Sequence, residues 1–196
     1  MIRLFACSIF LLWASTVSAF EYPALHSVNG VAADDVLNIR ENPSASSPVV
    51  SDLKPNETGL EVIKTTDDGR WGLINVTEGI GWVAMRYLSL ATGSDPKLRC
   101  YGTEPFWGAS LRPDASFALA DEPAQDYQVL AQPSSTNRTD RFSVIAQNNA
   151  GRMIATVNAQ QCSDGMSDRT FGLSVELLIQ DTAGWNQYSS CCSLSQ

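Results

Sequence analysis

The chain has 196 residues, of which 44% are hydrophobic and 17% are charged. This composition supplies enough apolar material for one or two packed cores and too little charge for a disordered chain. Its 13 basic and 21 acidic residues give a net charge of −8 with no basic run, which excludes nucleic acid as the expected partner and gives no attraction to anionic lipids or polyanionic wall polymers.

The first 19 residues have the layout of a secretory signal peptide. Arg3 precedes an apolar run from Leu4 to Ala14, and the small residues 17–19 suit cleavage after Ala19. The run is shorter than the roughly 20 apolar residues of a membrane-spanning helix. We therefore expect a periplasmic or secreted protein with no membrane span in the mature chain.

Residues 20–35 show no clear pattern, and short alternating runs follow them. Leu37 and Ile39 alternate with polar neighbours, and turn formers such as Asp67-Asp68-Gly69 separate the later runs. Such runs predict a small β-barrel or sandwich over about 28–90. We expect its core to contain Leu37, Ile39, Leu60, Val62, Ile74, Trp82 and Val83.

Four motifs of this region resemble a known family. LNIRENPSASSPVV (37–50), DGRW (68–71), GWV (81–83) and YL (87–88) are similar to the bacterial SH3-type domain, in this order and at its spacings. The resemblance implies an SH3-like barrel. It also implies a binding role, since bacterial relatives are associated with cell-wall targeting, especially of peptidoglycan stem peptides.

The alternation of 71–76 places Trp71 on the face opposite Ile74, so Trp71 is the best candidate for an exposed aromatic residue. The candidate ligand-binding surface is Asn38, Arg40, Trp71, Arg86 and Tyr87. The alternative is that Trp71 and Tyr87 pack in the core while both arginines are solvated. Ala84 and Arg86 occupy positions where eukaryotic SH3 domains have the proline and asparagine that bind polyproline, so we do not expect a polyproline ligand.

Residues 91–99 contain Gly93, Ser94, Asp95 and Pro96 and are expected to form a linker. The cysteines beyond the leader all lie after it: Cys100, Cys162, Cys191 and Cys192. An even number on an exported chain predicts two disulfides. Adjacent cysteines rarely bridge each other, so Cys191 and Cys192 each take one of Cys100 and Cys162. No CxxC pair or nearby histidine accompanies them, so no metal or cofactor is expected.

Apolar or alternating runs continue through residues 100–196, with Asn-Asn-Ala-Gly at 148–151 as a hairpin signal. About seven strands are predicted, in a meander barrel or a sandwich. The whole protein is therefore expected to be all-β, with two domains.

The second half also resembles a family, through GTEPFW (102–107), CSDGMSDR (162–169) and the late Cys-Cys pair. This family comprises envelope-associated secreted or lipoprotein domains of uncharacterised function. The resemblance covers about 98–196 and implies the pairs Cys162–Cys191 and Cys100–Cys192.

The sequence favours a binding protein over an enzyme. Asp164, Asp168 and Glu104 could supply paired carboxylates, but structural use in turns is favoured. His26 is the sole histidine and lies outside both motif sets, and no hydrolase or nucleotide-binding motif is present.

We therefore expect an exported, non-catalytic envelope protein whose SH3-like domain binds a cell-wall peptide or peptidoglycan fragment. The alternative is an inhibitor or accessory partner of a periplasmic enzyme such as lysozyme, toward which acidity would steer it.

Overall fold

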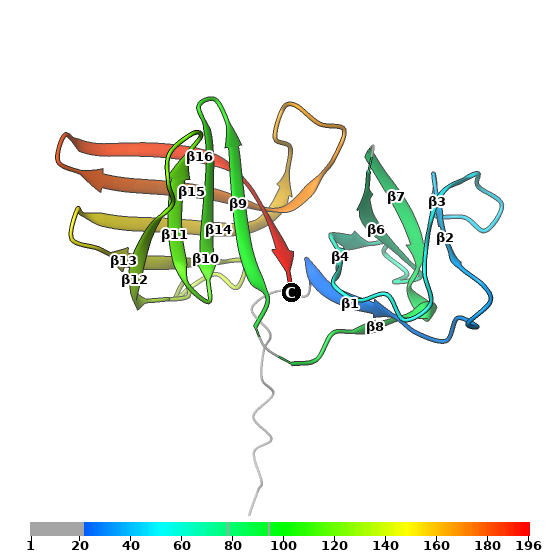
Figure 1. The fold of residues 1–196 in the computed structure, drawn as a ribbon. Coiled ribbons are helices and arrows are strands. Elements are labelled where there is room, and N and C mark those ends of the chain that lie inside the picture. The colour runs from blue at the N-terminus through cyan, green and yellow to red at the C-terminus, as the bar shows by residue number, and fades with distance from the viewer. Residues whose placement is uncertain (1–21, 78, 94) are drawn as a thin grey trace, which may run out of the picture.

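The computed structural model describes residues 22–77, 79–93 and 95–196, so the expected signal peptide at 1–19 lies outside the described residues. The described chain is all-β, as the sequence predicts, with one 3₁₀ turn, η1 (Met85–Tyr87). Two β bodies lie side by side, joined by the segment between β8 and β9 (Figure 1). The strands of the first are β1 (Ala24–Val28), β2 (Leu37–Arg40), β3 (Val49–Leu53), β4 (Leu60–Val62), β5 (Lys64–Thr65), β6 (Trp71–Val76), β7 (Gly79–Ala84) and β8 (Leu88–Leu90). Those of the second are β9 (Lys97–Thr103), β10 (Phe106–Arg112), β11 (Ala115–Leu119), β12 (Gln125–Ala131), β13 (Arg141–Gln147), β14 (Arg152–Cys162), β15 (Phe171–Asp181) and β16 (Gly184–Ser195).

The first body consists of two small antiparallel sheets, ordered β4-β1-β8 and β3-β2-β7-β6-β5. Their shared core contains Val28, Leu37, Ile39, Leu53, Val62, Ile74 and Val83. β1 lies in the segment where the sequence pattern predicts no element, and it pairs with both β4 and β8. The first body is therefore closed by a strand that the periodicity of its own sequence does not predict.

Trp82 is not in this core, contrary to the expectation from sequence. Along β7 the buried residues are Gly79, Gly81 and Val83, so strand alternation turns Trp82 to the outer face. Gly81 is required on the inner face because a Cβ there would lie 2.3 Å from Cγ2 of Ile39. The GWV motif thus supplies one core valine, one close backbone approach and one outward tryptophan.

The second body is a closed, eight-stranded barrel in which each strand pairs with the next in sequence and β16 pairs back to β9. It is the meander barrel of the two expected architectures. The hairpin signal at 148–151 connects β13 to β14, and the Asn148 side chain accepts hydrogen bonds from the amides of Ala150 and Gly151. β9 begins at Lys97, inside the segment expected to be linker.

Apolar side chains fill the barrel, and the GTEPFW motif contributes to that filling. Trp107 is buried and packs with Phe117 and Tyr188, with ring centroids 5.1 to 6.1 Å apart. A Cβ on Gly102 would lie 1.8 Å from Nε1 of Trp107. Gly102 and Trp107 are therefore a matched pair, in which the missing side chain of one makes room for the other, whereas Phe106 is exposed.

The two disulfides join Cys100 to Cys192 and Cys162 to Cys191, the pairs that the family resemblance implies. Successive side chains of a strand point to opposite faces. Cys192 lies in the barrel core with Cys100, its direct partner on β9, and so the side chain of Cys191 points to the outside of the wall. Strand alternation thus explains why neighbouring cysteines belong to different bridges.

Hydrogen bonds join the two bodies. The amide group of Asn75 on β6 donates to the Thr170 carbonyl at 2.9 Å and accepts from the Thr170 N–H at 3.1 Å. The Glu61 carboxylate on β4 accepts from the Leu194 N–H on β16 at 2.9 Å. The end of β16 thus lies against β4 and β1 (Figure 1).

Candidate functional site

Trp71 is held at the start of β6 by the turn that precedes it. The Thr66 N–H donates to the Trp71 carbonyl at 2.9 Å, and the Trp71 N–H donates to the Thr66 hydroxyl at 3.2 Å. Gly69 adopts φ +66° in this turn, a conformation that glycine takes without a steric cost. The cross-strand partner of Trp71 is Ala84, whose single methyl group cannot cover the indole ring. Trp71 is consequently half-buried on the outer face.

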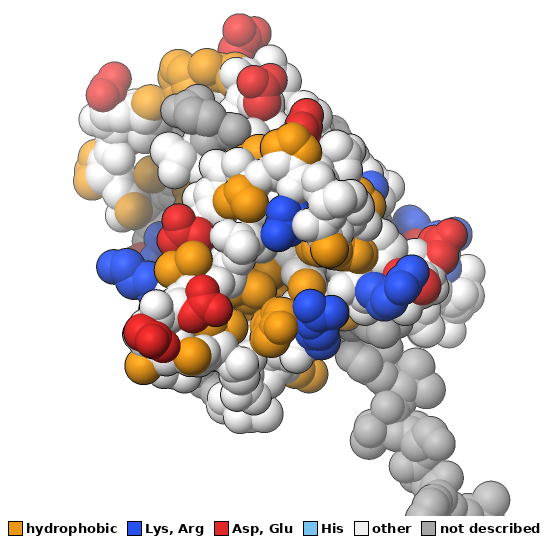
Figure 2. Space-filling view, turned by 90° about the vertical axis from the view of Figure 1, so that its right-hand side faces the viewer, with side chains coloured by type: hydrophobic (Ala, Val, Ile, Leu, Met, Phe, Trp, Pro, Cys, Tyr) orange, Lys and Arg blue, Asp and Glu red, His pale blue; other side chains and the backbone are white. Residues whose placement is uncertain are grey.

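Two hollows meet at Trp71, and we call them together the Trp71 groove. The first, of about 440 Å³, has these side chains among its lining: Val31, Asp35, Val36, Asn38, Arg40, Trp71, Arg86 and Tyr87. The second, of about 710 Å³, has these: Pro43, Ser44, Ala45, Arg70, Trp71, Ala84, Met85 and Arg86. All five residues expected at the binding surface thus line the first hollow. Figure 2 looks onto the first body and shows hydrophobic and basic side chains side by side across the middle of that face.

Arg40 supports the groove wall from within the fold. Its Nη1 donates to the Ser47 carbonyl at 2.6 Å, and the hydroxyl of buried Ser47 accepts from the Asn42 N–H at 2.9 Å. These bonds fix the loop 41–48, which contributes Pro43 and Ala45 to the second hollow. Asn38, two residues earlier on β2, lies on the same outer face and is exposed.

Arg86 and Tyr87 come from η1, directly after β7. The guanidinium carbon of exposed Arg86 lies 4.8 Å from the centroid of the Tyr87 ring, within the range of a cation–π contact. Tyr87 also packs partly against the core of the first body. Tyr87 therefore combines the two roles that the sequence leaves open, because one part of its side chain packs inside while another lines the groove.

The groove concentrates the positive charge of an acidic domain. Residues 20–96 contain 5 basic and 11 acidic residues. Three of the basic ones, Arg40, Arg70 and Arg86, line the groove, whereas Asp35 is its only acidic lining residue among those described. Charge in the groove is therefore opposite in sign to that of the surrounding domain.

The three arginines differ in what already holds them. Arg70 pairs with Asp68, whose pKa is lowered to about 2 by hydrogen bonds from the Thr66 hydroxyl and from Arg70 itself. Asp68 therefore stays ionised at neutral pH, and its exposed ion pair offsets part of the charge of Arg70. In the described part of the chain, no carboxylate lies within ion-pair distance of Arg40 or Arg86.

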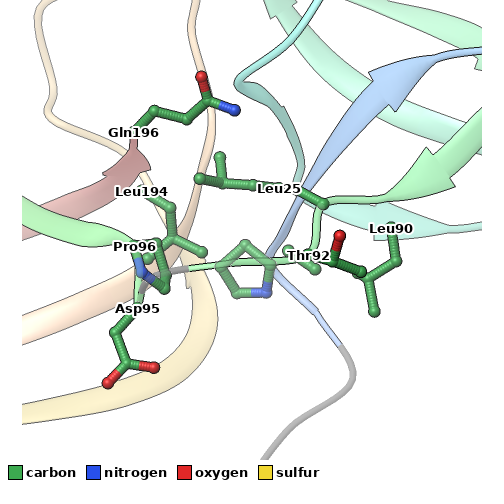
Figure 3. A pocket seen from close by; sticks show the side chains of 10 residues that line it. Leu25, Leu90, Thr92, Asp95, Pro96, Leu194 and Gln196 are labelled. Carbon is green, nitrogen blue, oxygen red and sulfur yellow. The ribbon is translucent and has the colours of Figure 1, made fainter.

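A third hollow, of about 420 Å³, lies between the two bodies (Figure 3). Leu25 of β1 and Leu194 of β16 point into it from opposite sides, and Leu90 and Pro96 complete much of its lining. Among the described residues that line it, Asp95 has the one charged side chain. Its polar side chains are those of Thr92, Asp95 and Gln196.

Two of the side chains considered for catalysis, Asp164 and His26, make contacts within the fold. The Asp164 carboxylate accepts hydrogen bonds from the amides of Met166 and Ser167 and from the Ser167 hydroxyl, which closes its own loop. His26 is buried in β1 within hydrogen-bond distance of the Ala24 carbonyl, and burial lowers its pKa. Across residues 22–77, 79–93 and 95–196, no group of three or more His, Cys, Asp or Glu side chains is placed to hold a metal ion. Nor does that part of the chain contain a helix of sufficient length and apolarity to span a membrane.

Sequence reasoning misses several lining residues of the groove. Val31 and Val36 come from a segment without periodicity, and Met85 comes from the 3₁₀ turn. Arg70 could have been predicted from the sequence, because it directly precedes Trp71 in the DGRW motif. Neighbouring side chains at the end of a strand can line the rim of the same groove.

Residues 35–89 match the family model of the bacterial SH3 domain. The match supports the resemblance seen in the four motifs, and it contains every one of the five candidate residues. No curated protein matches the chain significantly. The resemblance of residues 98–196 to an envelope-associated family remains a prediction.

Proposed function

We propose that this protein is an exported, non-catalytic binding protein of the bacterial cell envelope, and that its Trp71 groove binds a peptide or a peptidoglycan fragment. The observation that carries the proposal is the position of Trp71. It is the half-buried aromatic residue at which two hollows meet, within a domain that matches a family of binding modules.

An aromatic ring in such a place suits recognition of an extended ligand. It presents a rigid apolar face that loses little conformational entropy on binding. The hollows on either side can each accept a group of a chain that crosses the ring. The two disulfides fit the export that the signal peptide predicts, because such bonds persist in oxidising compartments.

The test is retention of the purified protein on peptidoglycan sacculi, comparing wild type with Trp71→Ala. The loss of a central aromatic contact is expected to reduce retention at least tenfold. Trp185→Ala is the control, because Trp185 is an accessible tryptophan, half-exposed, that lies on β16 of the barrel and away from the groove. Failure of the wild type to bind sacculi, or equal retention of wild type and Trp71→Ala, would contradict the proposal.

A further inference from the structure

The most informative feature of the groove is a pair of arginines without acidic partners. Arg40 and Arg86 line the same hollow beside Trp71, and the described residues provide no ion pair for either of them. Elsewhere in the first body acidic residues outnumber basic ones. A cationic hollow in an acidic domain is the arrangement expected where an anionic ligand binds.

From this charge pattern, and resting on the proposed function, we propose that the Trp71 groove recognises a short peptide through a carboxylate that pairs with Arg86. The apolar part of that peptide crosses Trp71. Arg40 acts as a positioning residue, because its bond to the Ser47 carbonyl holds the loop that forms the groove wall.

Arg86 is well placed for this role. Its side chain is exposed on η1, and its contact with the Tyr87 ring restricts the guanidinium while leaving it accessible to solvent. A guanidinium offers paired donors that match the two oxygens of a carboxylate. Arg70 contributes less net charge, because Asp68 lies beside it in an ion pair.

The charge of the rest of the protein favours a short ligand over a long polyanion. A polymer with many phosphates would extend from the groove onto a negatively charged surface that repels it, since the whole chain has a net charge of −8. Asp35 at the first hollow also repels a second negative group. A short peptide can place one carboxylate on Arg86 and keep any other away from Asp35.

The first experiment compares native sacculi with sacculi whose carboxyl groups have been converted to amides by carbodiimide and ammonium. Amidation and the substitution Arg86→Gln are each expected to reduce retention of the protein about tenfold or more, because each removes a charge-assisted pair. The matched control is Arg152→Gln, which removes the same charge from an exposed position on β14. It should bind native sacculi like wild type.

The second experiment uses a soluble probe, the tripeptide Ala-Glu-Lys with free carboxylates, against the same tripeptide in which both carboxyl groups are amides. Binding of the free form alone, weakened by Arg86→Gln, supports the inference. Equal retention on native and amidated sacculi, together with a loss caused by Trp71→Ala, would refute the carboxylate while leaving the proposed function standing.

Two other outcomes separate the proposals. If wild type binds the free tripeptide but not sacculi, the wall-binding function fails and the carboxylate site remains. If inorganic phosphate displaces the protein from sacculi at concentrations where glutarate does not, the site selects phosphate and the carboxylate inference is wrong.

Discussion

Replacing Glu61 with glutamine should remove a pH dependence that the domain interface imposes on stability. Burial between β4 and β16 raises the pKa of Glu61 from 4.5 to about 7, although the Leu194 N–H and the charge of Arg169 act in the opposite direction. Between pH 4.5 and about pH 7, the folded protein therefore binds a proton at Glu61 more readily than the unfolded chain does. In that window the free energy of unfolding must fall as the pH rises.

The size of this loss follows from the shift. At about 1.4 kcal/mol per pKa unit, the raised pKa corresponds to a loss of about 3 kcal/mol between pH 4.5 and pH 7. This is an upper limit, because opening of the interface would let water reach the carboxylate and return its pKa toward 4.5. Glu61→Gln keeps an oxygen that can accept from the Leu194 N–H and cannot ionise, so it should escape the loss.

The assay is urea denaturation of both proteins, with disulfides intact, from pH 4.5 to pH 8. The difference between the two curves isolates Glu61, because the lowered pKa of His26 affects both proteins alike. We expect similar stability near pH 4.5 and a growing advantage of Glu61→Gln up to about pH 7. Parallel curves, or a relative gain by wild type as the pH rises, would refute the reasoning.

Three further predictions concern the fold and are measured by urea denaturation. Gly102→Ala should cost about 1–3 kcal/mol through its clash with Trp107, whereas the control Gly108→Ala, which meets nothing within 4 Å, should have little effect; equal costs would contradict the pairing. Asn75→Ala should cost about 1–3 kcal/mol, because it leaves the N–H and carbonyl of buried Thr170 without this partner, while Asn149→Ala at the exposed hairpin should stay within about 0.5 kcal/mol. Removing the Cys100–Cys192 bridge should cost about 1 kcal/mol more stability than removing the Cys162–Cys191 bridge. The reason is that the Cys100–Cys192 bridge closes the longer loop, with a sequence separation of 92 against 29. The reverse order would contradict an origin in loop entropy.

The periodicity of the sequence predicted the buried face of a strand correctly where the strand and its immediate partner alone determine which side chains are buried. It placed Leu37, Ile39 and Val83 in the core, and it indicated the hairpin between β13 and β14. It failed for Trp82, where hydrophobicity suggested burial but the alternation with Gly81 and Val83 turns the ring outward. The size and apolarity of a residue thus predict its burial less well than its position in the strand alternation, when a glycine next to it occupies the inner face.

Alternation also cannot say what covers an outward face. Leu73 shares the outer face of β6 with Trp71, yet only 2% of its surface is exposed. Asn75, the next outward residue, binds Thr170 of the second body, which lies over this end of the strand. Trp71, at the other end, remains beside the groove. Contacts between distant segments decide this difference, and no local pattern contains them.

The groove was partly predictable for a similar reason. Asn38, Arg40 and Trp71 lie on strands whose alternation assigns them to one face, and the family motifs added Arg86 and Tyr87. The loop 41–48 contributes through bonds to Ser47, which depend on the folded path of the chain.

The Cys191-Cys192 doublet couples oxidation to the register of β16. Exchanging the two partners would need this strand to slide by one residue against β9, and such a slip would turn every side chain of β16 to the opposite face. Cys192 would then leave the interior and polar serines would enter it. The register of β16 that buries its apolar side chains is thus also the register that places each cysteine of the doublet beside its own partner.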